Sequence, residues 1–310
     1  MCVGGFRCKY RQWIRCGIHG CTYCQQKVID AAGRGLKYLR TTLYLNCVSG
    51  VSGDMMLGVL LDLLGKDDLR PFLEGLALEG YGVEVSRAKK KGIMGVDVKV
   101  TSSEVHPHRG LKEVLEIIEK SSISSAACDK ASEAFLLLAE AEGSVHGVLP
   151  EKVHFHEVGA VDAIVDIVGS CILMDTLAPS RIVASPVNVG SGTVKCAHGE
   201  MPVPTPATAK LLEGVPVFSK GEAMERTTPT GAVLLKVFAD EFGALPPGSI
   251  TRTGYGLGDR DTDLANVLQG IILKDRSCSS ADGAEMARPG QDHPIGIHDH
   301  GCRKTCDHKH

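Results

Sequence analysis

The amino-acid sequence predicts an α+β (mixed α/β) protein, and three observations support that prediction. Between residues 43 and 273, segments with apolar residues at helical spacing are interspersed with short segments that alternate as strands do. Glycine is abundant, at 36 of 310 residues, and aromatic residues make up only 5%. This composition favours many tight backbone turns over a β-sandwich built on aromatic packing. We expect several amphipathic helices packed on short mixed strands.

The overall composition narrows the classes of function. At 310 residues and 43% hydrophobic, the chain is long enough for a substantial core. Its 34 basic and 37 acidic residues give a net charge of −3, which argues against nucleic-acid binding and against a disordered acidic chain. No apolar run approaches a membrane span, and the basic N-terminus lacks an apolar signal core. We therefore expect a cytoplasmic protein with neither a nucleic-acid nor a membrane partner.

The first half is expected to run strand, helix, two strands and three helices. A strand at 43–48 leads through a Gly/Ser turn into a helix near Asp54, where leucines recur at helical spacing from Leu57 to Leu64 and Gly65 ends the helix. The further elements predicted are strands at 83–86 and 96–100 and helices at 111–120, 129–145 and 159–177.

The second half is expected to mix short strands with short helices. The elements predicted are a strand at 181–185, a helix at 207–212, a strand at 215–218, a helix at 230–242 and strands at 250–255 and 266–273. Past Asp275 the apolar period stops, and Ser, Gly, Pro, Asp and His dominate. The strand pairing does not follow from this pattern.

Composition divides the chain into an extra leader at 1–40, a core at 41–275 and a disordered tail at 276–310. The leader is basic and holds five of the twelve cysteines, which indicates either a loose zinc site or a non-native extension. The tail has five histidines and two cysteines in its last 18 residues, which predicts metal binding unless it is a cloning tag. The ligands predicted there are His298, His300, Cys302 and Cys306.

The most informative segment combines histidines with carboxylates. If 152–155 is extended, His154 and His156 point to one side, and the following helix places Asp162 and Asp166 one turn apart on one face. Together with Glu157, these groups predict a divalent-metal or substrate site with nitrogen and oxygen ligands, suited to Ni, Zn, Mn or Fe. The alternative is that the histidines bond to nearby backbone and that the aspartates pair with Lys or Arg.

A second pair of histidines, His106 and His108, precedes the predicted helix at 111–120 beside Arg109. This arrangement suits a metal or an anion at a helix N-terminus, whereas Pro107 also fits an ordinary exposed turn. Farther along the chain, Cys196 and His198 form a possible thiolate–imidazole pair.

Two glycine-rich loops are candidates for binding a phosphate. One joins the first strand to the first helix, and the other lies at 188–192. The positions predicted to bind are Gly50, Ser52, Gly53, Gly190 and Gly192. Asp54 would repel a phosphate unless a metal lies between them, and Ser52 or Asp54 is equally suited to capping the helix.

Five unusual strings resemble the nickel insertion proteins of nickel-pincer cofactor synthesis, the LarC family. The strings are Leu43-Tyr-Leu-Asn-Cys-Val-Ser-Gly-Val-Ser-Gly-Asp-Met, Val153-His-Phe-His-Glu-Val-Gly-Ala-Val-Asp-Ala-Ile-Val-Asp-Ile-Val-Gly, Pro186-Val-Asn-Val-Gly-Ser-Gly, Cys196-Ala-His-Gly-Glu-Met-Pro-Val-Pro and Thr228-Pro-Thr-Gly-Ala. They occur in the family's order and extend the likeness over about residues 43–275.

The resemblance implies a lyase-type nickel cyclometallase, or nickel chelatase. Such an enzyme inserts Ni²⁺ into pyridinium-3,5-bisthiocarboxylic acid mononucleotide, forming two Ni–S bonds and one Ni–C bond. The family consumes CTP with Mn²⁺ or Mg²⁺, and the product serves enzymes of the lactate racemase type. For such a reaction our own assignment is that His154, His156 and Asp162 hold nickel and that Asp166 or Glu157 accepts the ring proton.

The sequence departs from the family pattern in three respects. Residues 1–40 are extra, Asn46 stands where Asp is usual, and Gly110 interrupts a basic string. Family members also continue past a His-rich tract into a C-terminal domain that binds CTP and metal, sometimes joined by a ribosomal frameshift. We therefore expect a separate C-terminal CTP-binding half. The competing hypotheses are a nickel chaperone or storage protein without catalysis, and a two-metal phosphohydrolase.

Overall fold

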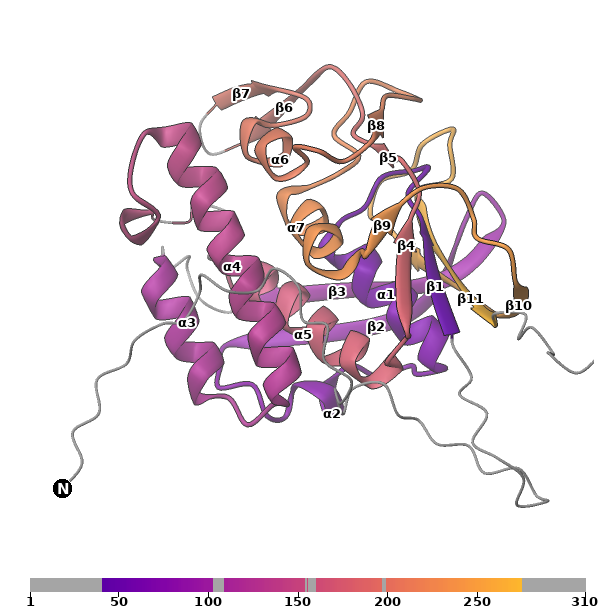
Figure 1. The fold of residues 1–310 in the computed structure, drawn as a ribbon, viewed down its shortest axis with the longest axis horizontal. Helices are drawn as coiled ribbons and strands as arrows, with labels where there is room; N and C mark the ends of the chain where they lie inside the picture. Colours follow the sequence, from indigo (N-terminus) through magenta and orange to yellow (C-terminus); the bar gives the residue numbers. More distant parts are fainter. Residues whose placement is uncertain (1–40, 103–108, 154, 156–159, 197–198, 275–310) are drawn as a thin grey trace, which may run out of the picture. The chain divides into compact units, whose positions relative to one another are not determined.

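A seven-stranded mixed sheet forms the centre of the fold in the computed structural model, which describes residues 41–102, 109–153, 155, 160–196 and 199–274. Its strands are β1 (Thr41–Asn46), β2 (Tyr81–Lys90), β3 (Ile93–Ser102), β4 (Arg181–Ala184), β9 (Glu241–Phe242), β10 (Ser249–Leu257) and β11 (Val267–Lys274). They follow the order β2-β3-β10-β11-β1-β4-β9 (Figure 1). Strand β1 pairs antiparallel with β11 and parallel with β4, so the first strand of the core lies near the middle of the sheet.

Two small two-stranded sheets supplement the main sheet. One pairs β5 (Val187–Asn188) with β8 (Val217–Phe218), and the other is the hairpin of β6 (Thr193–Cys196) and β7 (Gly199–Pro202). The helices are α1 (Gly53–Leu64), α2 (Arg70–Leu73), α3 (Leu111–Lys120), α4 (Ser125–His146), α5 (Val161–Leu177), α6 (Pro206–Leu211) and α7 (Pro229–Phe238), with a 3₁₀ turn at Pro150–Lys152.

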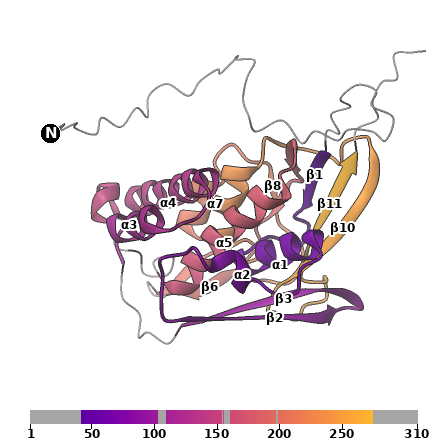
Figure 2. The same cartoon turned by 90° about the horizontal axis from the view of Figure 1, so that it is seen from below.

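Helix α1 lies between the sheet and the remaining helices. It packs on β3, β10 and β11 on one side and on α5 on the other, and α5 packs in turn on α4 (Figure 2). A helix covered on both sides must be apolar nearly all round, and nine of the twelve residues of α1 are buried. At Gly256 in β10 an added β carbon would come within 1.9 Å of the Met55 carbonyl oxygen, so a glycine is needed for this close packing.

The predicted α+β class is confirmed, and most predicted elements are present with shifts of a few residues at their ends. The prediction of one helix over 230–242 is wrong at its C-terminal end. Helix α7 ends at Phe238, and the chain then pairs with β4 as β9. Just before β9, the Asp240 carboxylate accepts a hydrogen bond from the Ile182 N–H, and the Asp240 N–H donates to the Ile182 carbonyl oxygen. Pairing at the sheet edge thus overrides the local helical pattern.

Three other differences concern local structure. Residues 150–152, of which Lys152 was expected to be extended, form a 3₁₀ turn. Helix α4 begins at Ser125 rather than at 129, because the Ser124 side chain accepts a hydrogen bond from the Ala127 N–H and caps it. The short strands β5, β6 and β7 were not anticipated. Among the residues that the structure describes, no helix combines the length and the apolarity needed to cross a membrane.

Candidate functional site

The turn between β1 and α1 brings the first carboxylate into the candidate site. Gly50 has a φ of +87°, which a glycine adopts without strain. Ser52 occupies the N-cap position of α1 in extended conformation, without a side-chain capping hydrogen bond. The Ser52 hydroxyl donates a hydrogen bond to the carboxylate of Asp54, in the first turn of the helix. Ser52 thus orients Asp54, which is partly buried at this end of α1.

The first turns of α5 supply two more carboxylates. Asp162 and Asp166 lie four residues apart, as the sequence predicts, but their environments differ: Asp162 is exposed, whereas Asp166 is partly buried. The Asp166 side chain packs against Gly53, where an added β carbon would lie only 2.3 Å from its Oδ2 atom. The start of α5 is therefore docked on the start of α1.

Burial and neighbouring carboxylates raise the pKa values of Asp54 and Asp166. Burial raises the pKa of Asp54 to about 6, the hydrogen bond from Ser52 counteracts this shift, and the charge of Asp259 adds to it. Burial also raises the pKa of Asp166 well above its usual range, and the charges of Asp54, Asp162 and Asp259 raise it further. Four acidic side chains from three parts of the chain thus share one electrostatic environment. We call Asp54, Asp162, Asp166 and Asp259 the carboxylate cluster.

Asp259 was not identified from the sequence. It lies in the loop between β10 and β11, in the string Gly258-Asp-Arg-Asp-Thr-Asp263. That density of acidic residues directly after a strand was a usable signal. The loop is held by Lys90 of β2, whose ammonium group donates to the Asp259 carbonyl oxygen at 3.0 Å and to Asp261 Oδ1 at 2.8 Å.

The carboxylate cluster offers acidic oxygens that suit a cation, but the described residues do not form a complete metal site. Within the described residues, none of its four carboxylates forms an ion pair with Lys, Arg or His. The same residues contain no group of three or more His, Cys, Asp or Glu side chains arranged to hold a metal ion. A metal bound here needs ligands from elsewhere or a shift of these side chains.

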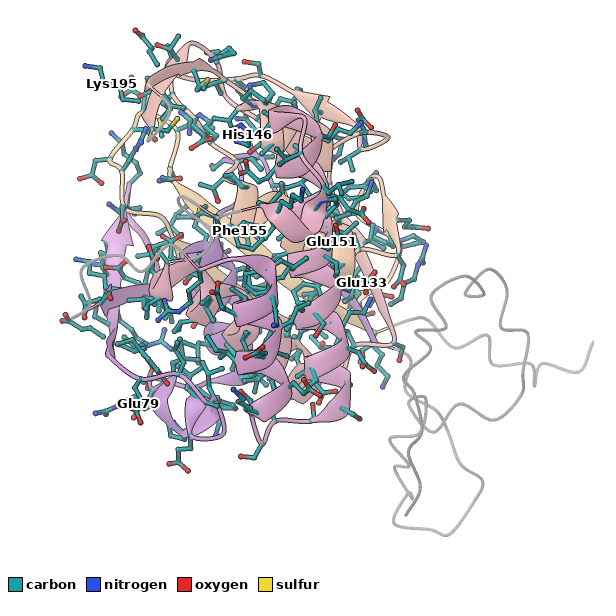
Figure 3. All side chains as sticks on the ribbon, turned by 90° about the vertical axis from the view of Figure 1, so that its left-hand side faces the viewer. Glu79, Glu133, His146, Glu151, Phe155 and Lys195 are labelled. Carbon is teal, nitrogen blue, oxygen red and sulfur yellow. The ribbon has the colours of Figure 1, made fainter. Side chains whose placement is uncertain are left out.

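Most of the predicted histidine and cysteine ligands lie outside the described residues. His106, His108, His154, His156, Glu157 and His198 lie outside the described residues, as do the tail positions His298, His300, Cys302 and Cys306. Phe155, between two of these histidines, is buried and packs edge-on against Phe135 with ring centroids 6.1 Å apart. Its N–H donates to the Arg109 carbonyl oxygen, and Figure 3 labels it near the middle of one face of the molecule.

The two glycine-rich loops lie next to each other, held by a third segment at 224–231. Val51 forms a bridge with Thr227, and Gly190 forms one with Glu225. The close approach requires glycines, because an added β carbon would lie 2.0 Å from the Arg226 carbonyl oxygen at Gly50 and 2.0 Å from the Met224 carbonyl oxygen at Gly190.

Several amides of these loops are already hydrogen bonded. The N–H groups of Gly50, Val51 and Ser191 donate to backbone carbonyls, and that of Gly190 donates to the Asn188 side chain at 3.1 Å. The glycines therefore have a packing role, and a phosphate-binding role for Gly50, Ser52, Gly53, Gly190 and Gly192 stays a prediction.

Other candidate features lie apart from the carboxylate cluster or lack reactivity. Cys47 is buried, and burial raises the pKa of its thiol to about 12, so it is not a ready nucleophile.

A cavity of about 380 Å³ is lined by Cys171, Asp175 and Lys236 among others, near the C-terminal end of α5, whereas Asp162 and Asp166 lie near its N-terminal end.

Comparison with known proteins identifies similar chains. A family model described as "Nickel insertion protein" matches residues 43–293. A "Putative nickel insertion protein" of Dictyoglomus thermophilum is 41% identical over 228 residues, which cover 73% of this chain and 59% of the relative. A "Pyridinium-3,5-bisthiocarboxylic acid mononucleotide nickel insertion protein" of Desulfitobacterium hafniense is 44% identical over 227 residues, covering 73% and 56%.

A further relative with that second name, from Geobacillus kaustophilus, is 40% identical over 251 residues, which cover 77% of this chain and 61% of the relative. The matched region thus spans about three fifths of the length of these relatives. No solved structure matches the chain significantly.

Proposed function

The chain belongs to the nickel insertion protein family, and from that premise we propose that it inserts Ni²⁺ into pyridinium-3,5-bisthiocarboxylic acid mononucleotide. The proposal is supported by relatives that carry this substrate in their names and by the carboxylate cluster, which combines four acidic side chains with no compensating cation among the described residues. In this reaction nickel is a substrate that passes through the site.

The ligand chemistry of the carboxylate cluster suits a metal that must be released. Carboxylate oxygens are harder donors than sulfur, so Ni²⁺ held by Asp54 and Asp162 would pass to the two sulfur atoms of the substrate more readily than Ni²⁺ held by thiolates. His154 and His156 are proposed to complete the ligand set with imidazole nitrogens. Their positions in the sequence flank Phe155, whose backbone is fixed next to Arg109.

Formation of the Ni–C bond requires a base. The ring C–H bond breaks, its electron pair forms the bond to nickel, and the proton must go to an acceptor. Asp166 is our candidate, because a carboxylate with a pKa well above its usual range holds a proton more tightly than a hydrated carboxylate does. Glu157 is the second candidate, and it lies outside the described residues.

The remaining family properties belong to the same proposal. We assign the CTP-dependent step with Mn²⁺ or Mg²⁺ to a separate C-terminal half, and we expect lactate racemase-type enzymes to use the product. A cytoplasmic location and a lyase-type classification are also parts of this proposal. No residue of the described core is given a role in CTP binding.

A metallation assay read by mass spectrometry tests the proposal. The full chain is mixed with the dithiolated mononucleotide, Ni²⁺, Mn²⁺ and CTP, with and without the C-terminal domain of a longer family member. We expect a nickel-containing product when that domain is present. Alanine at both His154 and His156, or Asp166→Asn, should abolish it, whereas Asp68→Asn, at an exposed ion pair with Arg70, should not. Nickel bound by the chain without any product would instead indicate a carrier or storage protein.

A further inference from the structure

Arg226 is a buried arginine that uses few of its hydrogen-bond donors within the described residues. Its side chain is 0% exposed, and its Nη2 atom donates to Glu222 Oε2 at 2.7 Å. Nε and Nη1 are also buried, and neither has an acceptor within the described residues. Buried guanidinium groups ordinarily have their donors satisfied, because desolvated N–H groups without acceptors are unfavourable. Nε and Nη1 of Arg226 are therefore available to bind an anionic oxygen of a ligand.

Arg226 lies next to the candidate site, between the two glycine-rich loops. Its N–H donates to the Val189 carbonyl oxygen, and its own carbonyl accepts from the Val51 N–H, so Arg226 joins the two glycine-rich loops. Gly50 packs against its backbone and β carbon, and Gly221 packs against its guanidinium group, where an added β carbon would lie 2.5 Å from Nη2. These glycines leave space for the arginine where any larger residue would fill it.

Glu222 has the properties of a replaceable partner. Its side chain is 42% exposed, so its carboxylate is within reach of water while the arginine is not. Its Oε1 atom accepts a hydrogen bond from the Asp263 N–H at 2.6 Å, which ties the segment 219–223 to the β10–β11 loop. Residues 219–223 are all exposed. The exposed Glu222 side chain can move away from Arg226 more easily than any of the buried backbone around it.

We propose that Arg226 binds the phosphate group of the mononucleotide and that Glu222 occupies the guanidinium group until the phosphate replaces it. The proposal rests on the proposed function for the identity of the ligand. Phosphate is favoured over the thiocarboxylates of the same molecule, because those must face the nickel ion. Arginine donors match phosphate oxygens well, and a charge-assisted hydrogen bond is stronger than a neutral one.

Isothermal titration with two probes tests the proposal. The probes are the dithiolated mononucleotide and the corresponding nucleoside, which lacks the phosphate. The wild-type protein should bind the mononucleotide at least about tenfold more tightly, since charge-assisted hydrogen bonds contribute that much to affinity. Arg226→Gln should remove this preference and leave nucleoside affinity unchanged. Arg87→Gln, which removes a surface arginine paired with Asp62 and Asp67, is the matched control.

A second variant tests the proposal even if Arg226→Gln fails to fold. Glu222→Gln keeps an acceptor for the Asp263 N–H but removes the competing charge, so it should tighten binding of the mononucleotide and not of the nucleoside. Glu213→Gln removes an exposed charge paired with Lys210 and should change neither. Equal affinity of the wild-type protein for both probes, or an unchanged preference in Glu222→Gln, would overturn the proposal. A phosphate preference without metallation would retain it and count against nickel insertion alone.

Discussion

The carboxylate of Asp166 lies directly against Gly53: an added β carbon at position 53 would come within 2.3 Å of Asp166 Oδ2 and 2.6 Å of Asp166 Cβ. The second distance matters more, because Cβ is fixed to the backbone of α5 and cannot rotate away. The first residue of α1 and the second turn of α5 can therefore approach this closely only because residue 53 has no side chain. This contact places a proposed base next to the turn that carries Asp54.

Gly53→Ala should consequently separate the two helices at this end. The conformation at Gly53 is accessible to alanine, so the effect should come from crowding, which costs about 1–3 kcal/mol in a packed interior. We expect lowered stability in urea unfolding and a larger loss in the metallation rate. Gly243→Ala is the control, because nothing lies within 4 Å of its added β carbon. Equal effects of the two substitutions would show that the contact is unimportant.

The raised carboxyl pKa values predict how stability depends on pH. The folded protein holds a proton on Asp54 up to a pKa of about 6, whereas the unfolded chain releases it near 3.8. Between these values the folded state binds more protons, so the free energy of unfolding should fall as the pH rises, by up to about 3 kcal/mol for this group. Asp166 adds to this fall, because its pKa is also raised well above its usual range.

Neutral substitutions check this sign. Asp54→Asn and Asp166→Asn should each raise the melting temperature at pH 7 and flatten its decline between about pH 4 and 6, since the group that loses its proton is gone. Melting curves at several pH values measure this slope. Asp68→Asn should leave it unchanged, because hydrogen bonds from Arg70 lower the pKa of Asp68. Stability that rises with pH in this window would mean that Asp54 and Asp166 are not protonated in the folded protein.

Local sequence patterns predicted most helices and strands, but they did not predict how these elements pair and pack. The leucines of α1 and the spacing of Asp162 and Asp166 depend on neighbouring residues only, and both were predicted. Asp259 approaches Asp54 and Asp166 from about a hundred residues or more away in the chain, through a sheet order that no periodicity reveals. The contact of Asp166 with Gly53 and the burial of Arg226 also arise only from tertiary packing.

Lys90 is predicted to affect the reaction more than the fold. It holds the Asp259 carbonyl and the Asp261 carboxylate, but Asp261 is 87% exposed, so the ion pair itself should contribute at most about 1 kcal/mol. Lys90→Met should release the loop that carries Asp259 and slow metallation several-fold, with little change in the urea midpoint. Lys112→Met on α3, at an exposed lysine with a longer contact to Glu116, should do neither. A parallel loss of stability and rate would assign Lys90 a purely structural role.

Asn188 should be the most sensitive polar residue of the described core outside the carboxylate cluster. Its side chain is completely buried and makes four hydrogen bonds: Nδ2 donates to the Val48 and Lys220 carbonyls, and Oδ1 accepts from the N–H groups of Gly190 and Lys220. These bonds join the loop after β1, the loop at 188–192 and the segment that leads to Arg226.

Asn188→Asp isolates the two donated bonds. Aspartate can still accept from Gly190 and Lys220, but it turns a carboxylate toward the carbonyls of Val48 and Lys220, so it should destabilise the protein by about 3 kcal/mol or more. Because the change buries a charge, the loss should shrink as the pH is lowered and the aspartate becomes protonated. Asn46→Asp, at a partly buried amide bonded to Gln269, should cost much less. Urea unfolding at pH 7 and pH 5 separates these outcomes, and equal costs at the two sites would show that Asn188 does not hold the loops together.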